Sequence, residues 1–178
     1  MATTASSSIN SIQPQNYDYF LVLDFEATCE ANQKLQPSEI IEFPVLKING
    51  RTFECESIFH TYVQPTVHPQ LTRFCTDLTG ITQSMVTDQP ILEEVLKRFH
   101  TWLTDENLLS ESTRFIFVTC GDWDLYTMLP KQCNYFQLSK ADYFKHWINI
   151  KRSFHDVAGS TERIDMMEKL SGLNISHA

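Results

Sequence analysis

The sequence lacks the segments that carry a chain to or across a membrane. No apolar run approaches the length of a membrane span. Residues 1–16 are rich in Ser, Thr, Ala and Gln, and they have neither the basic start nor the apolar middle of a signal peptide. We therefore expect residues 1–16 to be a disordered tail. We expect an intracellular protein, cytoplasmic or nuclear, with no membrane partner.

The sequence also lacks paired cysteines. Its five cysteines include no C-x-x-C pair, and its six histidines do not cluster with them, which argues against a zinc site. An odd count without a secretory signal favours a reducing compartment. Free cysteines mostly behave as small apolar residues, so we expect buried structural thiols. These residues are Cys29, Cys55, Cys75, Cys120 and Cys133.

Basic residues are in deficit, and the formal net charge is -8. Proteins that bind polyanions usually display a basic patch, so this balance argues against tight nonspecific binding of nucleic acid. A site that holds cations, however, must concentrate carboxylates. The only notable basic stretch contains Lys145, His146, Lys151 and Arg152. We interpret it as a solvated helix end, with a nucleic-acid contact as the alternative.

What is present predicts one α/β domain over residues 17–178. An apolar content of 42% with 12% aromatic residues excludes a disordered chain. Strands are expected at 19–28, 39–48, 53–63 and 114–120, and helices at 69–77, 90–103, 122–129, 140–147 and 162–170. The first strand is apolar on both faces, as in the middle of a sheet, and Pro44 predicts an irregularity in the second. A meander followed by βα units indicates a mixed β-sheet flanked by helices.

Two acids interrupt the most apolar strand. Asp24 and Glu26 are two residues apart, so their carboxylates project from one face, roughly 7 Å from each other. At an effective dielectric near 20 their repulsion is about 2 kcal/mol. The strand has no Lys or Arg to offset it, and magnesium suits carboxylate oxygens. The alternative is that one acid reaches solvent at the end of the strand.

A second acidic segment, Gly-Asp-Trp-Asp at 121–124, follows the strand at 114–120. Carboxylates at a strand-to-helix junction lie at the carboxyl edge of the sheet, where ligands bind in α/β proteins. Asp122 has a competing interpretation as a helix N-cap. Asp124 has one as a residue that favours the helix dipole.

Four segments in order resemble the DEDDh 3′-5′ exonucleases: DFEATC at 24–29, EIIEFP at 39–44, LTGIT at 78–82 and GDWD at 121–124. The branch of histone-mRNA 3′-end exonucleases and prion-protein-interacting exoribonuclease homologues is the most similar, over roughly residues 19–177. The resemblance implies an RNase H-like fold. It also implies a metal-dependent hydrolase that removes nucleotides from the 3′ end of RNA.

The resemblance also implies roles for single residues. Asp24, Glu26 and Asp124 would be catalytic and would hold two Mg²⁺ ions, with Mn²⁺ as a substitute. Glu26, Ala27, Ile81 and Trp123 would contact the terminal nucleotide, although Ile81 and Trp123 have core packing as the alternative. The implied partners are single-stranded RNA 3′ ends or the nucleotide monophosphate product, and a protein partner stays open. His60 and His68 match no motif and are expected to be structural.

The last motif of that family is H-x-x-x-x-D, and the sequence ends Ser176-His177-Ala178. We do not assign His177 as the general base, and we expect His155 and Asp156 to lie in a loop. Impaired activity is expected, together with an apolar sheet surface left uncovered. One alternative is a catalytically inactive form that binds nucleic acid or a partner. Another is a DNA exonuclease, because no residue here reveals recognition of the 2′-OH.

Overall fold

The structure is a computed structural model, and it describes residues 15–158. Most of the expected tail, the helix expected at 162–170 and His177 lie outside this range. No helix between residues 15 and 158 is long and apolar enough to cross a membrane.

Within residues 15–158, six strands form one sheet, which is mixed as predicted. They are β1 (Tyr19–Leu23), β2 (Glu26–Ala27), β3 (Ile40–Asn49), β4 (Cys55–Tyr62), β5 (Phe115–Thr119) and β6 (Trp147–Asn149). β3 pairs antiparallel with β4 along one side, and with β1 and then β2 along the other. β5 and β6 extend the sheet in parallel with β1.

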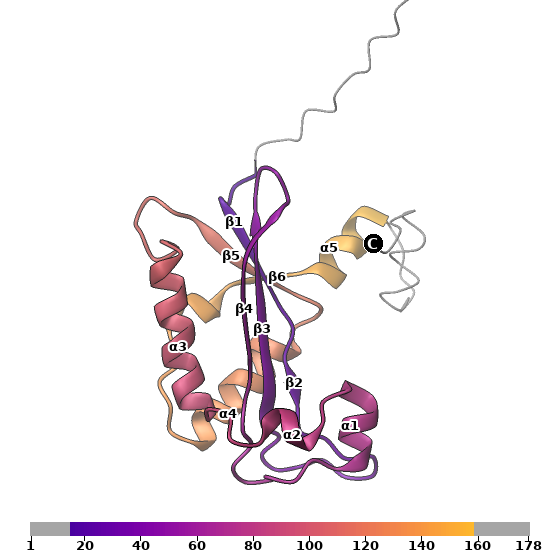
Figure 1. The fold of residues 1–178 in the computed structure, drawn as a ribbon. Coiled ribbons are helices and arrows are strands. Elements are labelled where there is room, and N and C mark those ends of the chain that lie inside the picture. The colour runs from indigo at the N-terminus through magenta and orange to yellow at the C-terminus, as the bar shows by residue number, and fades with distance from the viewer. Residues whose placement is uncertain (1–14, 159–178) are drawn as a thin grey trace, which may run out of the picture.

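Helices cover one face of this sheet and its lower end in Figure 1. They are α1 (Arg73–Thr79), α2 (Gln83–Val86), α3 (Leu92–Asp105), η1 (Trp123–Met128), α4 (Leu129–Tyr135), η2 (Asp142–Lys145) and α5 (Ile150–Ala158). α3 runs along the sheet, as its apolar spacing predicts, and buries Leu92, Val95, Phe99 and Leu103. Its Phe99 ring packs 5.0 Å from the Phe43 ring and 5.7 Å from the Phe144 ring, centroid to centroid. The core lies between the sheet and these helices.

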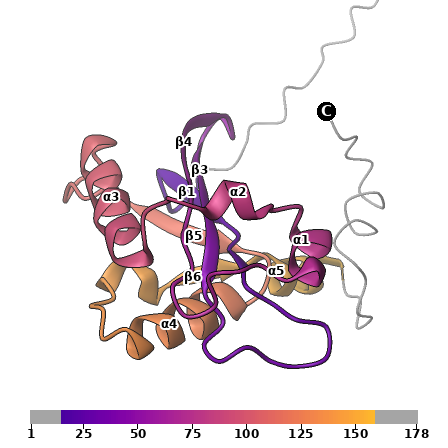
Figure 2. The same cartoon turned by 60° about the horizontal axis from the view of Figure 1, so that its bottom comes forward.

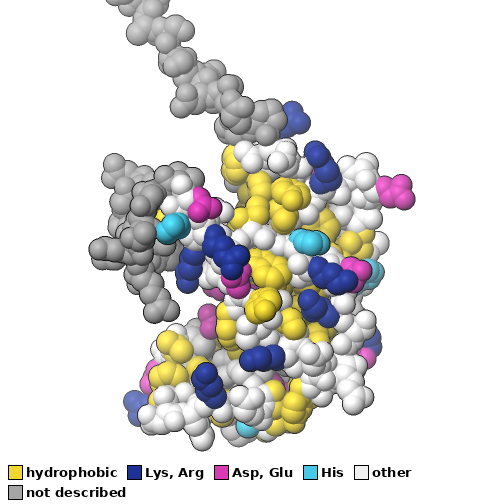
Figure 3. All heavy atoms as spheres, turned by 180° about the vertical axis from the view of Figure 1, so that it is seen from behind, with side chains coloured by type: hydrophobic (Ala, Val, Ile, Leu, Met, Phe, Trp, Pro, Cys, Tyr) yellow, Lys and Arg dark blue, Asp and Glu magenta, His cyan; other side chains and the backbone are white. Residues whose placement is uncertain are grey.

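The opposite face of the sheet is less enclosed. Its apolar side chains alternate with those of the core, and Val22 is 37% exposed while Ile58 is 59% exposed. The expectation that the first strand is buried on both faces is therefore wrong for Val22. Seen from behind, apolar side chains gather on the upper half of the molecule, and basic side chains occur singly or in small groups around them (Figure 3).

The expected strand at 19–28 is divided in two. β1 ends at Leu23 and β2 begins at Glu26. On the neighbouring strand, Pro44 lies between the residues that pair with Leu23 and Glu26. A proline has no amide hydrogen to donate, so the break falls opposite the missing donor. The irregularity predicted for Pro44 thus appears in the neighbouring strand, whereas Pro44 itself pairs in regular register with His60.

Three local predictions need correction. The helix expected at 69–77 begins at Arg73, because Thr72 is its N-cap and accepts a hydrogen bond from the Cys75 amide at 3.0 Å. Gly80 ends it at a φ of 75°. The helix expected at 140–147 is only the 3-10 turn η2, followed by β6. His155 and Asp156 lie in α5 and not in a loop.

Candidate active site

The broken strand determines where its two acids point. The side chains of Leu23 and Phe25 are buried in the core, at 1% and 3% exposure. Alternation along the chain places Asp24 and Glu26 on the other side, as the sequence predicted. Asp24 is exposed and Glu26 is half-buried.

Asp124 is brought to the same break by η1. Its side chain is only 3% exposed, and its Oδ1 accepts a hydrogen bond of 2.8 Å from the Phe25 amide. That amide lies in the gap between β1 and β2, where the sheet leaves it without a strand partner. The third acid therefore completes the backbone hydrogen bonding of the strand that carries the first two.

Asp122 was expected to cap the helix that follows it, but its side chain makes other contacts. It stands at the N-cap position of η1, but its side chain makes no capping hydrogen bond. Its Oδ1 accepts from Trp147 Nε1 at 3.0 Å, and its Oδ2 pairs with Arg152. The N-cap interpretation is wrong, and Asp122 instead ties β6 and the start of α5 to the turn that carries Asp124.

The acids crowd one another electrostatically. Burial raises the pKa of Glu26, and the charges of Asp24, Glu42 and Asp124 raise it further. Burial also raises the pKa of Asp124; the Phe25 hydrogen bond opposes this and the charge of Asp24 adds to it. Burial likewise raises the pKa of Asp24. The charge of Lys151 lowers this pKa, and the charge of Glu42 raises it. The three predicted acids thus lie within electrostatic reach of one another.

Glu42 is a fourth acid at this place that the sequence did not single out. It is the direct cross-strand partner of Glu26, and its Oε1 lies 2.6 Å from His60 Nε2. A pair of acids facing each other across two strands is visible only once the register is known.

The basic stretch is divided by β6. Lys145 pairs with Asp142 at 2.6 Å, on the near side of that strand. On the far side, Lys151 in α5 lowers the pKa values of Asp24 and Asp124 through its charge. Lys145 and Lys151 are both exposed, as a solvated helix end predicts, and Lys151 is in addition near enough for its charge to act on the acids.

Besides Glu26, three residues are expected to contact a nucleotide, and they differ in exposure. Ala27 is 7% exposed, and its carbonyl oxygen accepts from Cys75 Sγ at 3.6 Å. Ile81 is 2% exposed and packs in a small core with Ile41 and Val86. This agrees with core packing, the alternative to a nucleotide contact. Trp123 is 46% exposed, so its ring is open to a ligand. Contact with a nucleotide stays a prediction for all three.

The thiols are only partly as expected. Cys75 and Cys133 are buried, whereas Cys55 is exposed. Cys29 is half-buried beside Cys75, and burial raises its pKa to about 12. A thiol with so high a pKa is not a nucleophile at neutral pH.

The carboxylates at this place are chemically suited to a divalent cation, but their side chains are not positioned around one. Between residues 15 and 158, no three or more His, Cys, Asp or Glu side chains are arranged to hold a metal ion. Asp124 has one oxygen engaged by the Phe25 amide and Glu42 has one beside His60. Nevertheless, carboxylates that repel one another are the oxygen donors magnesium prefers, and magnesium completes its shell with water and phosphate. A cation at this place would remove the repulsion.

The fold assigns the class of protein. It is similar to the crystallographic structure of the nuclease domain of 3′hExo, a DEDDh family member, bound to rAMP. The TM-score is 0.81 with 34% sequence identity, over 92% of this chain and 82% of that one. The chain therefore has the fold of the DEDDh exonucleases.

The family follows from the sequence comparison. The RNase T family model, which describes exonucleases, matches residues 21–177, and the chain belongs to this family. The match includes His177, which lies outside the described residues. The "ERI1 exoribonuclease 3" of Homo sapiens is 56% identical over 167 residues, which is 94% of this chain and 49% of the relative. The "3'-5' exoribonuclease 1" of Mus musculus is 40% identical over 159 residues, which is 86% of this chain and 46% of the relative. The chain spans about half the length of the curated relatives it matches.

Proposed function

We propose that this chain is a magnesium-dependent 3′-5′ exoribonuclease, with residues 17–178 as its exonuclease domain. The observation that carries the proposal is the hydrogen bond of Asp124 to the Phe25 amide, which lies between Asp24 and Glu26 in the chain, together with burial and neighbouring carboxylates that raise the pKa of each acid. Repulsion among carboxylates destabilises a fold, and a pair of bound cations would offset that repulsion.

The three carboxylates would hold two Mg²⁺ ions, with Mn²⁺ as a substitute. Such ions would supply activation of a water and neutralisation of charge on the scissile phosphate and its leaving oxygen. The protein keeps the ligands in position: Phe25 fixes Asp124 through its amide, and Asp122 anchors the flanking α5. Trp123 would offer its exposed ring to the terminal base, and the buried Ala27 and Ile81 would contact the same nucleotide.

RNA is the proposed substrate, with a nucleoside monophosphate as the product. The relatives are named exoribonucleases, and the similar nuclease domain was solved with rAMP. Recognition of the ribose 2′-OH is what separates RNA from DNA at such a site.

A ladder assay tests the proposal. Single-stranded RNA labelled at its 5′ end should shorten from its 3′ end in magnesium, and EDTA should stop the reaction. Asp24→Asn removes one charged ligand and should lower the rate by at least about 100-fold, as for loss of a major electrostatic contribution. Asp77→Asn is the matched control, because Asp77 is an exposed acid paired with Arg73, and it should keep the wild-type rate.

Three outcomes would contradict parts of this proposal. Full activity in Asp24→Asn would reject the site. RNA binding without turnover in the wild-type chain would favour a non-catalytic binding form. Equal turnover of DNA of the same sequence would reject the preference for ribose.

A further inference from the structure

A cleft leads away from the acids and shares only Trp123 with the site residues described so far. It has a volume of about 800 Å³ and lies between the loop that follows β2 and the helical segment η1–α4. Figure 2 shows that loop as a wide arc at the end of the sheet. Thr28 and Trp123 line the end of the cleft beside the acids, and Tyr135 lines it at the end of α4.

One face of η1 and α4 forms a wall of the cleft. Trp123, Thr127, Lys131 and Tyr135 recur every four residues, and all four line it. Residues four apart lie on the same side of a helix. The row runs from the start of the π-helix η1 to the end of the α-helix α4. It begins one residue before Asp124, so the wall is continuous with the acidic site.

The lining includes two aromatic side chains and two lysines. Trp123 is 46% exposed and Tyr135 is 56% exposed, so both rings are open. Lys34 and Lys131 also line the cleft and are exposed, and neither makes an ion pair with any residue between 15 and 158. Glu30 is the single acid of the lining, and its Oε1 accepts from the Ala31 amide at 2.7 Å.

We propose that this cleft holds the single-stranded RNA upstream of its 3′ end, leading from the terminal base on Trp123 to a further base stacked on Tyr135, with phosphates beside Lys34 and Lys131. The proposal rests on the proposed function, because it extends the path of the same substrate. Open rings beside unpaired cations are what sequence-independent single-strand binding requires, since every base has a face to stack and every linkage has a charge. A chain with net charge -8 that binds RNA must place its few free cations along such a path.

The test is the binding of a 5′-fluorescein-labelled uridine octamer, measured by fluorescence anisotropy in EDTA so that no turnover occurs. Tyr135→Ala should weaken binding about 10-fold, the loss of one stacking contact, and Tyr135→Phe should restore it. Lys131→Ala should reduce the slope of log K against log salt by about 0.7, the value for one phosphate contact on a single strand. In the presence of magnesium, both alanine variants should lose more activity on the octamer than on a dinucleotide.

Two control variants match these changes. Tyr126→Ala removes an aromatic residue of η1 that is 73% exposed and lies outside the cleft, and Lys97→Ala removes an exposed lysine of α3. Both should bind the octamer like the wild-type chain. Wild-type affinity and salt slope in the Tyr135 and Lys131 variants would overturn the proposal and favour a protein-docking cleft. If the variants lose octamer binding but the wild-type chain has no nuclease activity, the proposed function is overturned and the cleft assignment stands.

Discussion

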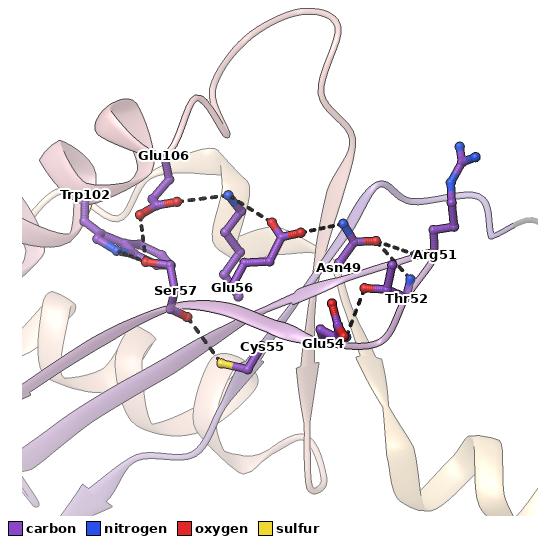
Figure 4. Close-up of polar contacts among 10 residues, drawn as sticks. Asn49, Arg51, Thr52, Glu54, Cys55, Glu56, Ser57, Trp102 and Glu106 are labelled. Atoms are coloured by element: carbon purple, nitrogen blue, oxygen red, sulfur yellow. Dashed lines mark hydrogen bonds and ion pairs between the residues drawn. The ribbon is translucent and has the colours of Figure 1, made fainter.

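Lys47 is a buried cation that joins the β3–β4 hairpin to α3. It is 7% exposed, its Nζ lies 4.2 Å from the centre of the Tyr19 ring, and it pairs with Glu106 Oε2 at 2.9 Å. The other oxygen of Glu106 accepts from Ser57 Oγ at 2.7 Å, and Ser57 in turn accepts from Trp102 Nε1 at 3.2 Å. Figure 4 shows this chain of contacts from the helix to the hairpin. Glu106 is the nearer of two anions that pair with the buried lysine, since Glu56 Oε2 lies 3.7 Å from Lys47 Nζ.

The Glu106 contact predicts a dependence of stability on pH. The Ser57 hydrogen bond, and then Lys47, lower the pKa of Glu106 below its usual 4.5. A lowered folded-state pKa contributes stability above the unfolded value, and this contribution disappears as pH falls through the folded pKa. Glu106→Gln should lose at most about 1 kcal/mol at pH 7, because the site is partly open to solvent. When the pH falls from 7 to below 4.5, the free energy of unfolding should therefore decrease less in Glu106→Gln than in the wild-type chain.

Urea unfolding at neutral and acidic pH measures this difference. Glu93→Gln is the control, because Glu93 pairs with Lys97 in solvent, and its loss with pH should follow the wild type. Identical losses in Glu106→Gln and the wild type would show that the lowered pKa has no effect on folding.

The acids of the site differ in how far the sequence reveals them. Asp24 and Glu26 could be predicted because charges stand out in an apolar strand, and their direction follows from strand alternation. Glu42 could not, because it meets Glu26 only through the register of β2 and β3. Lys151 could not either, because its approach to the acids depends on how α5 follows β6.

The break between β1 and β2 and the start of η1 act together through Asp124. Asp124→Asn keeps an oxygen for the Phe25 amide, so its melting temperature should stay close to that of the wild type. Asp124→Ala leaves that amide buried without an acceptor, at about 1–3 kcal/mol, which lowers the melting temperature by about 2–4 °C per kcal/mol. If Asp124 also holds a cation, both variants should lose nuclease activity. Thermal melts with parallel ladder assays separate the two roles, and an active Asp124→Asn would leave Asp124 with the structural role alone.

Elements were predictable where a local pattern determines them. α3 and the β3–β4 hairpin followed from helical spacing and from the turn at Asn49 and Gly50. β6 was missed because its three residues, Trp147–Asn149, form a strand only by pairing with β5 and carry no periodicity of their own. The break at Asp24 was missed for the same reason, since its cause lies on the neighbouring strand at Pro44.

At the scale of the whole molecule, the acidic site works against stability, and the proposed cations would relieve this effect. The net charge of -8 adds general self-repulsion to the local repulsion among Asp24, Glu26 and Asp124. Without divalent cations, Glu26→Gln should therefore melt at a higher temperature than the wild-type chain. Magnesium at about ten times its Kd should stabilise the wild type by about 1.4 kcal/mol, or about 3–6 °C.

The wild-type chain should gain this stability and Glu26→Gln should not, because the variant lacks one of the charges the cation compensates. Melting curves in magnesium chloride and in sodium chloride at equal ionic strength separate specific binding from screening. Asp77→Asn, with its exposed acid away from the site, should keep the magnesium shift of the wild type. Equal shifts of the melting temperature in all three chains would mean that magnesium acts as a diffuse counterion. The acids at the strand break would then not bind a specific cation.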